Sequence, residues 1–261
     1  MFQIDRANDF VGQEVEIKGW LYNKRSKGKI LFFILRDGSG YIQAVAIKNE
    51  VPERVFELYD RFGIESSVIA RGVIRKEPRA PGGFELSLTD IEPVQISTDY
   101  PIAKKEHGTA FLMEHRHLWL RSSKQIAVMR IRDTIERAII DFFHREGFVR
   151  IDTPILTATA AEDTTTLFTT EYFDLGNAYL AQTGQLYLEA AIAGHGLVYN
   201  FGPTFRAEKS KTRRHLTEFW MIEAEEAYYD NDDNIVLQEN FVSYIVERVL
   251  NENEKDLATL E

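Results

Sequence analysis

Residues 12–95 alternate apolar or β-branched side chains with polar ones, in short segments that turn residues separate. This alternation is typical of half-buried strands, because successive side chains of a strand point to opposite faces. The five segments are 15–25, 30–37, 40–48, 66–77 and 84–94. One helix-like piece, 52–62, falls between the third and the fourth. Five short strands with one helix at this place predict a small five-stranded β-barrel.

Basic side chains gather on this predicted barrel, although the whole chain has a net charge of −10. Residues 221–261 hold twelve acidic and two basic residues, which accounts for the whole imbalance. Residues 18–36 hold six basic residues and no acidic one. A local cationic patch on an acidic chain favours a polyanionic partner. We therefore interpret the barrel as the oligonucleotide-binding (OB) type, whose second and third strands take up single-stranded nucleic acid.

Three aromatic residues and one glutamine lie on those two strands: Phe32, Phe33, Tyr41 and Gln43. An aromatic side chain on a barrel strand belongs to the core more often than to a platform on which a base stacks. Neighbouring strand residues face opposite ways, so Phe32 and Phe33 cannot both be core.

The regular alternation stops between the barrel and a helical region. Residues 91–120 have no clean period and contain turn signals, so they read as a connection. We place the domain boundary near Asp99 and treat residues 100–122 as a linker. The second domain then covers residues 123–261.

The second domain opens with a long helix and a strand. Ser122 or Ser123 can cap the helix, and Gly147 ends it. The next segment, 148–156, predicts a strand that Pro154 breaks. Because the edges of sheets tolerate proline and their interiors do not, this strand is expected at an edge. A long helix followed by an edge strand suits an interface.

The rest of the second domain alternates strands and helices. A polar stretch at 157–166, a strand at 179–182 and a helix from Gln185 come first. Asp232 or Asp233 can cap the last helix. Its expected apolar side consists of Ile235, Val242, Ile245, Val249 and Leu250.

Two aromatic-rich apolar runs, 197–205 and 216–222, flank a basic turn. This pattern predicts an antiparallel hairpin with a long tip. The charged residues of the tip are Arg206, Glu208, Lys209, Lys211, Arg213 and Arg214. Such a tip favours a polyanionic ligand, because guanidinium and ammonium groups pair with phosphates. The alternative is a solvated, charged hairpin with no ligand.

Composition and motifs exclude several kinds of site. Cysteine is absent, which removes disulfides, thiolate nucleophiles and cysteine-bound metals. The six histidines show no metal-ligand spacing, and neither GxxxxGK[ST] nor GxGxxG occurs. There is no apolar run long enough to span a bilayer, and the first residues lack the layout of a signal peptide. We therefore expect a cytoplasmic enzyme or binding protein without membrane contact.

Three strings, in order along the chain, carry a family resemblance: FFILRDGSGYIQ, GFVRIDTPILT and FRAEKSKTRRHLTEFWMIEAE. They resemble the anticodon-binding barrel, the first motif and the second motif of class II aminoacyl-tRNA synthetases of the aspartyl/asparaginyl subgroup. The resemblance implies an α+β, multidomain fold: an OB-type barrel over 1–99, then a catalytic domain over 123–261 with an antiparallel sheet and flanking helices. It also implies a homodimer through the first-motif helix and strand, 123–156.

The second motif of this family binds ATP and the acceptor end of tRNA. By resemblance, Arg206 grips the α-phosphate and the substrate carboxylate, and Glu208 lies near the adenine and the terminal nucleotide. Arg214 and His215 match residues that hold the γ-phosphate, and Phe219 matches the aromatic residue that stacks on adenine. A guanidinium fork suits the first of these tasks, because it pairs bidentately with phosphate or carboxylate.

The amino-acid site is implied in the same way. Glu162 resembles the acid that pairs with the amino group of the substrate, with Gln182 and Gln185 in helper positions. In this subgroup glycine often follows that acid, whereas here Asp163 does.

Two further positions bear on which amino acid is bound. Aspartyl enzymes of the subgroup have a lysine where this chain has Leu188, and the loss of that cation removes the attraction for an aspartate carboxylate. Glu225 can accept from a side-chain amide and repel a carboxylate. Both features resemble the asparaginyl branch.

On the barrel, Phe32 and Gln43 match positions that stack on and pair with the anticodon, and Arg25 and Glu77 are weaker matches. The implied partner is therefore tRNA(Asn).

The resemblance implies ATP-dependent activation of asparagine to the adenylate, followed by transfer to the 3′ end of the tRNA. Neither step needs a protein nucleophile, so catalysis rests on positioning and on stabilising phosphate charge. Mg²⁺ is expected to bridge the phosphates, with ligands that the sequence does not identify. The third motif of the class is not found before Glu261, so we expect an N-terminal portion of a longer synthetase. The alternatives are a non-discriminating aspartyl enzyme and an inactive tRNA-binding module.

Overall fold

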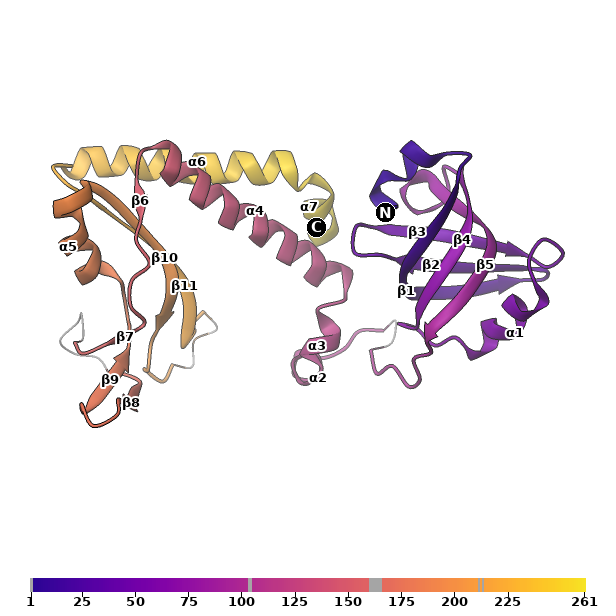
Figure 1. Ribbon diagram of the computed structural model, residues 1–261, viewed down its shortest axis with the longest axis horizontal. Coiled ribbons are helices and arrows are strands. Elements are labelled where there is room, and N and C mark those ends of the chain that lie inside the picture. The colour runs from indigo at the N-terminus through magenta and orange to yellow at the C-terminus, as the bar shows by residue number, and fades with distance from the viewer. Residues whose placement is uncertain (1, 103–104, 160–165, 211, 213) are drawn as a thin grey trace. The chain divides into compact units, whose positions relative to one another are not determined.

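A computed structural model describes residues 2–102, 105–159, 166–210, 212 and 214–261 (Figure 1). The chain divides into two compact units, Met1–Glu114 and His115–Glu261. This division lies inside the segment 100–122 that we interpreted as a linker, while the exact boundaries at 99 and 123 stay predictions. Along the part of the chain that the structure describes, no helix is long and apolar enough to cross a membrane.

The first unit is a closed five-stranded barrel with the strand order β1-β2-β3-β5-β4. Its strands are β1 (Glu14–Lys27), β2 (Ile30–Arg36), β3 (Tyr41–Ile47), β4 (Ser67–Lys76) and β5 (Phe84–Gln95). The helices of this unit are η1 (Ile4–Phe10), α1 (Glu53–Arg61), η2 (Pro81–Gly83) and α2 (Thr109–Glu114). All strand pairs are antiparallel except β3 with β5. The structure confirms the five predicted strands and the helix between the third and the fourth.

Alternation along the strands fills the barrel. Phe33 of β2 is fully buried and meets the rings of Tyr59 and Phe62 edge to face. The neighbouring Phe32 is only half-buried. The prediction that these two phenylalanines cannot both be core is therefore confirmed, and the ring of Phe32 faces outward.

The second unit has two small sheets and five helices among its described residues. Strands β6 (Val149–Arg150), β10 (Leu197–Phe205) and β11 (Glu218–Glu226) form one sheet in the order β11-β10-β6, and β7 (Leu156–Thr157), β9 (Asn177–Leu180) and β8 (Thr169–Glu171) form the other. The helices are α3 (Arg116–Trp119), α4 (Ser123–Arg145), α5 (Gln185–His195), α6 (Asn231–Glu252) and α7 (Glu254–Leu260). The long helix, the helix at Gln185 and the antiparallel hairpin are confirmed.

Aromatic packing fixes one face of the β10–β11 hairpin. Phe143 of α4 stacks on Tyr199 of β10 with ring centres 4.8 Å apart. Phe142 packs against Phe241 of α6, and both helices therefore lie on this face. Helices α4 and α6 thereby cover the apolar face of the hairpin. Its other face carries polar side chains such as Asn200, Thr204 and Glu223.

Two predicted strands have different limits in the structure. The segment expected at 148–156 is broken as predicted, and its two ends, β6 and β7, each lie at the edge of a sheet. The two edges belong to different sheets, which the sequence did not predict. Pro154 lies between them and cannot donate a ladder hydrogen bond. The second strand of the hairpin begins at Glu218 and runs to Glu226.

Helix α6 also differs from the prediction, at its N-terminus. Its cap is Asp230, whose carboxylate accepts from the backbone N–H groups of Asp232 and Asp233. Asp233 in turn accepts from the N–H of Asp230 and completes a capping box. The sequence offered several acids in a row, and only the backbone decides which one stands at the cap.

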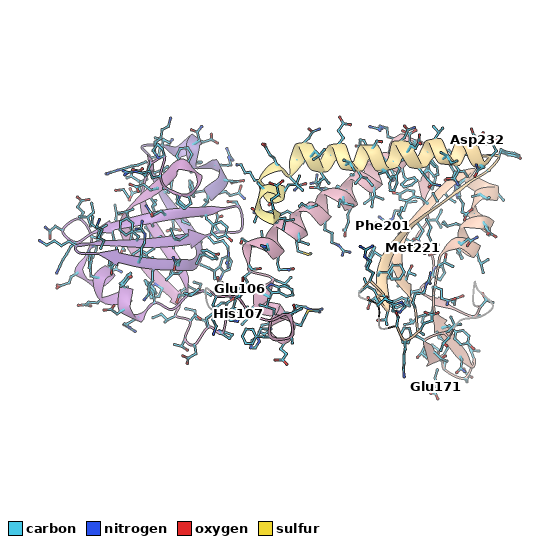
Figure 2. The ribbon with its side chains drawn as sticks, turned by 180° about the vertical axis from the view of Figure 1, so that it is seen from behind. Glu106, His107, Glu171, Phe201, Met221 and Asp232 are labelled. Carbon is cyan, nitrogen blue, oxygen red and sulfur yellow. The ribbon has the colours of Figure 1, made fainter. Side chains whose placement is uncertain are left out.

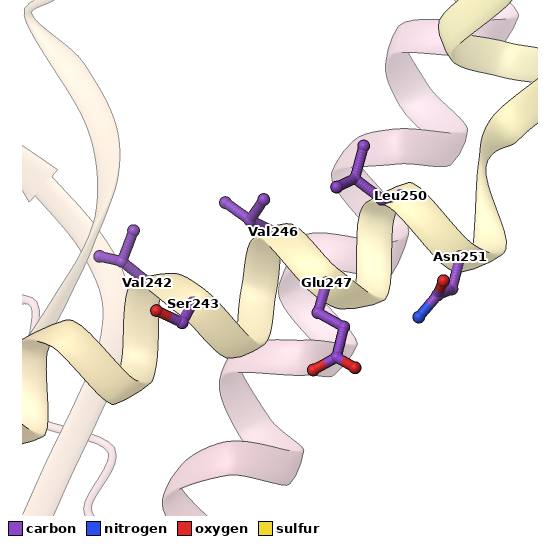
Figure 3. Close-up of a pocket in the computed structure, with 6 residues that line it drawn as sticks. All are labelled: Val242, Ser243, Val246, Glu247, Leu250 and Asn251. Atoms are coloured by element: carbon purple, nitrogen blue, oxygen red, sulfur yellow. The ribbon is translucent and has the colours of Figure 1, made fainter.

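The packed side of α6 is rotated from the expected one. Its apolar residues that pack on the core are Leu237, Phe241, Tyr244 and Ile245. By contrast, Val242, Val246 and Leu250 are 57%, 50% and 61% exposed, and they point together from one side of the helix (Figure 3). Ile235 is also exposed, at 46%. The expected apolar side is therefore wrong for Ile235, Val242 and Leu250 and right for Ile245.

Candidate functional site

The face of the β10–β11 hairpin opposite the packed one carries the candidate site. Directly opposite residues of an antiparallel pair share a face, and the register pairs Asn200 with Glu223 and Thr204 with Phe219. Tyr199 and Phe201, which alternate with them, lie on the packed face. Figure 2 labels Phe201 and also Met221, which the alternation assigns to the same face as Glu223. Strand alternation thus separates the apolar side of the hairpin from its chemistry.

A cavity of about 550 Å³ opens at the tip of this hairpin. Its lining is Arg206, Glu208, Arg214, His215, Leu216 and Phe219. The cavity therefore brings together all five residues that the sequence assigned to ATP. Two guanidinium groups and an imidazole can hold phosphate oxygens, and an aromatic ring can stack on a base.

Hydrogen bonds order this cavity. One Arg206 Nη atom donates to the carbonyl oxygen of Gln182 and, at 3.4 Å, to that of Phe205. The Arg206 guanidinium carbon lies over the Phe219 ring, 5.7 Å from its centre. His215 Nε2 lies 2.9 Å from the carbonyl oxygen of Glu208. The guanidinium is thus held between the hairpin and the segment that precedes α5.

That segment, 181–185, connects β9 to α5. Its Ala181 carbonyl accepts from the N–H of Phe205 at 3.0 Å. The Gln182 side chain is 4% exposed, and the residue lines a second cavity, of about 340 Å³. That second cavity is bounded by residues of 153–159 and 181–190.

The two other predicted residues of this region behave differently. Gln185 is exposed, and its amide donates to Glu189 at 2.9 Å. Leu188 is fully buried, one turn further along α5. The structure therefore groups Gln182 with the cavity, and it uses Leu188 as packing between α5 and its surroundings.

A carboxylate that the sequence reading missed, Glu223, is hydrogen-bonded at the centre of this region. It accepts from the hydroxyl of Thr183, from the N–H of Gly184 at 2.9 Å and from the amide of Asn200 at 3.4 Å. The signal that could have found it is the period of the strand, because Glu223 alternates with Ile222 and shares a face with Phe219 and Glu225.

Glu225, the acid that the sequence singled out, lies two residues further along the same face. Burial raises the pKa of its carboxyl above the ordinary value, and the nearby charges of Glu189 and Glu223 add to this. A negative group at this place is therefore costly, and it disfavours a second carboxylate nearby.

Glu162 and the neighbouring Asp163 lie outside the described residues. Among the described residues there is no group of three His, Asp or Glu side chains that could hold a metal ion.

The outward face of the barrel holds a second cluster. The Arg25 guanidinium carbon lies 4.0 Å from the centre of the Phe32 ring. Arg25 also donates to the side-chain oxygen of Gln43 at 3.1 Å, and the Gln43 amide donates to Glu85 at 3.4 Å. Arg25 therefore contacts two of the other three predicted anticodon residues, Phe32 and Gln43.

The fourth, Glu77, lies in the connection between β4 and β5. Its carboxylate accepts from the N–H and the Nε of Arg79, both at 3.1 Å, and these hydrogen bonds lower its pKa. The acid that reaches Gln43 is Glu85 instead. The parallel register of β3 with β5 pairs Gln43 with Glu85, a long-range pairing that no local pattern indicates.

Comparisons with protein families match both units. A family model described as "tRNA synthetases class II (D, K and N)" matches residues 108–260. A second, described as "OB-fold nucleic acid binding domain", matches residues 15–94. The fold class predicted from the sequence is confirmed.

Individual proteins are similar over nearly the whole chain. An asparagine–tRNA ligase of Herpetosiphon aurantiacus is 60% identical over 97% of this chain and 57% of its own length. A crystal structure of asparaginyl-tRNA synthetase from Pyrococcus horikoshii, complexed with asparaginyl-adenylate, aligns with a TM-score of 0.92, 40% identity, and 97% and 58% coverage. A putative aspartyl-tRNA synthetase from Leishmania major aligns with a TM-score of 0.82, 26% identity, and 96% and 52% coverage. The chain thus spans somewhat more than half the length of these proteins.

Proposed function

Because the chain belongs to the class II tRNA synthetases of the D, K and N group, we propose that the protein is an asparagine–tRNA ligase. It activates asparagine with ATP to the adenylate and transfers the asparaginyl group to the 3′ end of tRNA(Asn). The observation that carries this proposal is the tip cavity, which gathers Arg206, Arg214, His215 and Phe219 around one space. The relatives named as asparagine–tRNA ligases and the bound asparaginyl-adenylate in the similar structure support it.

In the proposed reaction ATP lies in the tip cavity, with its adenine on Phe219 and its phosphates toward the cationic groups. Arg206 grips the α-phosphate, where negative charge grows as the asparagine carboxylate attacks. Its anchoring to the Gln182 carbonyl fixes the guanidinium before the substrate arrives. Such preorganised charge stabilises a transition state without any protein nucleophile. Arg214 and His215 hold the γ-phosphate, and Glu208 lies near the adenine.

In the amino-acid site of the proposal, Glu162 pairs with the amino group of the substrate, with Gln182 and Gln185 in helper positions. Selection of asparagine over aspartate rests on two residues. Leu188 supplies no cation for a carboxylate, and Glu225 offers an acceptor for the side-chain amide while repelling a second negative charge. Mg²⁺, when bound with ATP, would neutralise phosphate charge, and no described residue is assigned to it.

On the barrel, the proposal places the anticodon of tRNA(Asn) at the Arg25–Phe32–Gln43 cluster. A base stacks on Phe32, and Gln43 pairs with a base edge within reach of Glu85. Glu77 belongs to this site only as a weaker candidate, because its carboxylate is already bound to Arg79.

A homodimer through residues 123–156 and a cytoplasmic location are further parts of the proposal. The homodimer is supported by apolar side chains of this segment that are 41–50% exposed: Val128, Met129, Val149, Ile155 and Leu156. Exposed apolar residues gathered on one segment are typical of an interface.

Asparagine-dependent exchange of pyrophosphate into ATP tests the proposal, with aspartate as the matched competitor. Exchange with asparagine alone supports it. Exchange with aspartate in place of asparagine would favour the non-discriminating aspartyl enzyme, which the lower identity to the aspartyl relative disfavours. Retained tRNA binding without any exchange would favour the inactive tRNA-binding module.

A further inference from the structure

The segment that leads into α5 is attached to both strands of the hairpin. On its β10 side, the Ala181 carbonyl accepts from Phe205. Arg206, just beyond β10, donates to the Gln182 carbonyl. On its β11 side, Glu223 accepts from Thr183 and from the N–H of Gly184. Three consecutive residues, 182–184, are thus each tied to the hairpin by at least one hydrogen bond.

The contacts of Glu223 continue into the first turn of α5. The hydroxyl of Thr183 donates to Glu223 and accepts from the N–H of Gln185 at 3.0 Å. The Thr183 hydroxyl therefore links the Glu223 carboxylate to the first residue of α5. An N–H at a helix start has no partner inside the helix, so an outside acceptor decides where the helix begins.

Close packing also restricts the position of the Gly184 backbone. A side chain at Gly184 would place its Cβ 2.7 Å from Thr153 Oγ1 and 2.8 Å from Asn200 Nδ2. The backbone of Gly184 therefore lies directly against these two side chains. Asn200 is 5% exposed and donates to the same carboxylate at 3.4 Å. Steric contact and hydrogen bonding thus hold the segment at the same place.

We propose that Glu223 is the positioning residue of the amino-acid site, and that it acts through the backbone of residues 182–185. Its carboxylate sets the position of Gln182, whose carbonyl in turn anchors the guanidinium of Arg206. One carboxylate on β11 thereby couples the amino-acid site to the ATP cavity. This inference rests on the proposed function for its substrate, asparagine, but the contacts that carry it belong to the chain itself.

The inference separates Glu223 from Glu225, which lies on the same face. Glu225 acts in the proposal on the substrate side chain, whereas Glu223 has its acceptor oxygens occupied by Thr183, Gly184 and Asn200. If Glu223 acts through Thr183, a change at Thr183 should have the same effect as a change at Glu223. Thr183→Val tests this, because it removes the hydroxyl and leaves the Glu223 charge in place.

The experiment compares the protein with Glu223→Gln, Thr183→Val and the double variant in asparagine-dependent pyrophosphate exchange. We expect each single variant to raise the KM for asparagine by about tenfold or more, as partly buried hydrogen bonds to a charged group are lost. The double variant should be no worse than the poorer single one, since both break the same connection. Glu226→Gln, on the same strand but on its other face, is the control and should match the unchanged protein.

Amide hydrogen exchange on the substrate-free protein gives a second readout. The amides of residues 184–188 should exchange faster in both single variants, while those of β10 and α4 keep their rates. Normal exchange and normal KM in Thr183→Val, beside a strong loss in Glu223→Gln, would overturn the inference and make Glu223 a direct substrate ligand. Additive losses in the double variant would overturn it as well. If the unchanged protein shows no asparagine-dependent exchange, the proposed function fails, and the amide rates alone decide whether Glu223 positions the segment.

Discussion

The Arg206 guanidinium lies over the ring of Phe219, with its central carbon 5.7 Å from the ring centre. The two residues come from opposite strands of the hairpin, one just after β10 and the other near the start of β11. A cation above an aromatic ring is held by the ring's negative face. The residue proposed to grip phosphate and the residue proposed to receive the base are thus arranged around one space.

Arg206→Lys should lower asparagine-dependent pyrophosphate exchange by about 10²–10³-fold, because a lysine keeps the charge but cannot form a guanidinium fork. The loss should fall on kcat more than on the KM for ATP. Lys209→Ala is the control, since Lys209 is exposed in the same tip and does not line the cavity. An Arg206→Lys variant with unchanged kcat would contradict the assignment.

Phe32→Ala should weaken the binding of tRNA(Asn) by roughly tenfold, as one stacking platform is worth about 1–3 kcal/mol. Pyrophosphate exchange should be unchanged, because the proposed amino-acid activation takes place in the other unit. Filter binding and exchange assays on the same preparation measure both. Equal damage to binding and exchange would mean that the change disturbs the fold.

A matched control lies one residue away. Phe33→Ala removes a fully buried ring and should destabilise the barrel by about 3–5 kcal/mol. The two neighbouring phenylalanines therefore separate a binding defect from a folding defect.

The sequence was sufficient for features that depend on local patterns. The barrel strands, the hairpin and the helix at Gln185 follow from periodicity and turn residues, which act over a few positions. The five residues that the family resemblance assigns to ATP are close in the sequence, on a single hairpin, so one string of letters contains them all.

What the sequence left open depends on long-range register. Glu85 meets Gln43 only because β3 and β5 pair in parallel, and Glu223 meets Thr183 only because β11 lies beside the segment before α5. Neither pairing leaves a trace in the local pattern. Glu77 shows the converse. Its position in the sequence matches the anticodon site, but its carboxylate is hydrogen-bonded to the neighbouring Arg79.

Helix α6 gives a test of such a correction. Phe241 packs on the rings of Phe142 and Phe143, whereas Val242 is 57% exposed. Phe241→Ala should lower the free energy of unfolding by roughly 2–3 kcal/mol, and Val242→Ser should change it by less than about 0.5 kcal/mol. Urea denaturation followed by circular dichroism measures both. A larger loss of unfolding free energy for Val242→Ser than for Phe241→Ala would instead support the apolar side that the sequence predicted.

Glu225 predicts a pH dependence of stability whose sign is fixed by its environment. Burial raises the pKa of its carboxyl, and Glu189 and Glu223 add to the effect. Above the ordinary pKa of 4.5 and up to the raised value, the folded chain therefore holds more protons than the unfolded chain. Stability contributed by this group then falls as the pH rises through that window.

Glu252 has the opposite sign, because its hydrogen bond with Arg248 lowers its pKa. The dependence of the unchanged protein is therefore a sum, and only a difference between variants isolates Glu225. Glu225→Gln removes the titrating group and keeps its size. The melting temperature of the variant, relative to that of the unchanged protein, should rise from about pH 4 to about pH 7. The reason is that the variant has no carboxyl at position 225 whose ionisation destabilises the fold. Thermal denaturation at both values measures the difference, and a gap that shrinks with rising pH would show that the surroundings of Glu225 stabilise its anion.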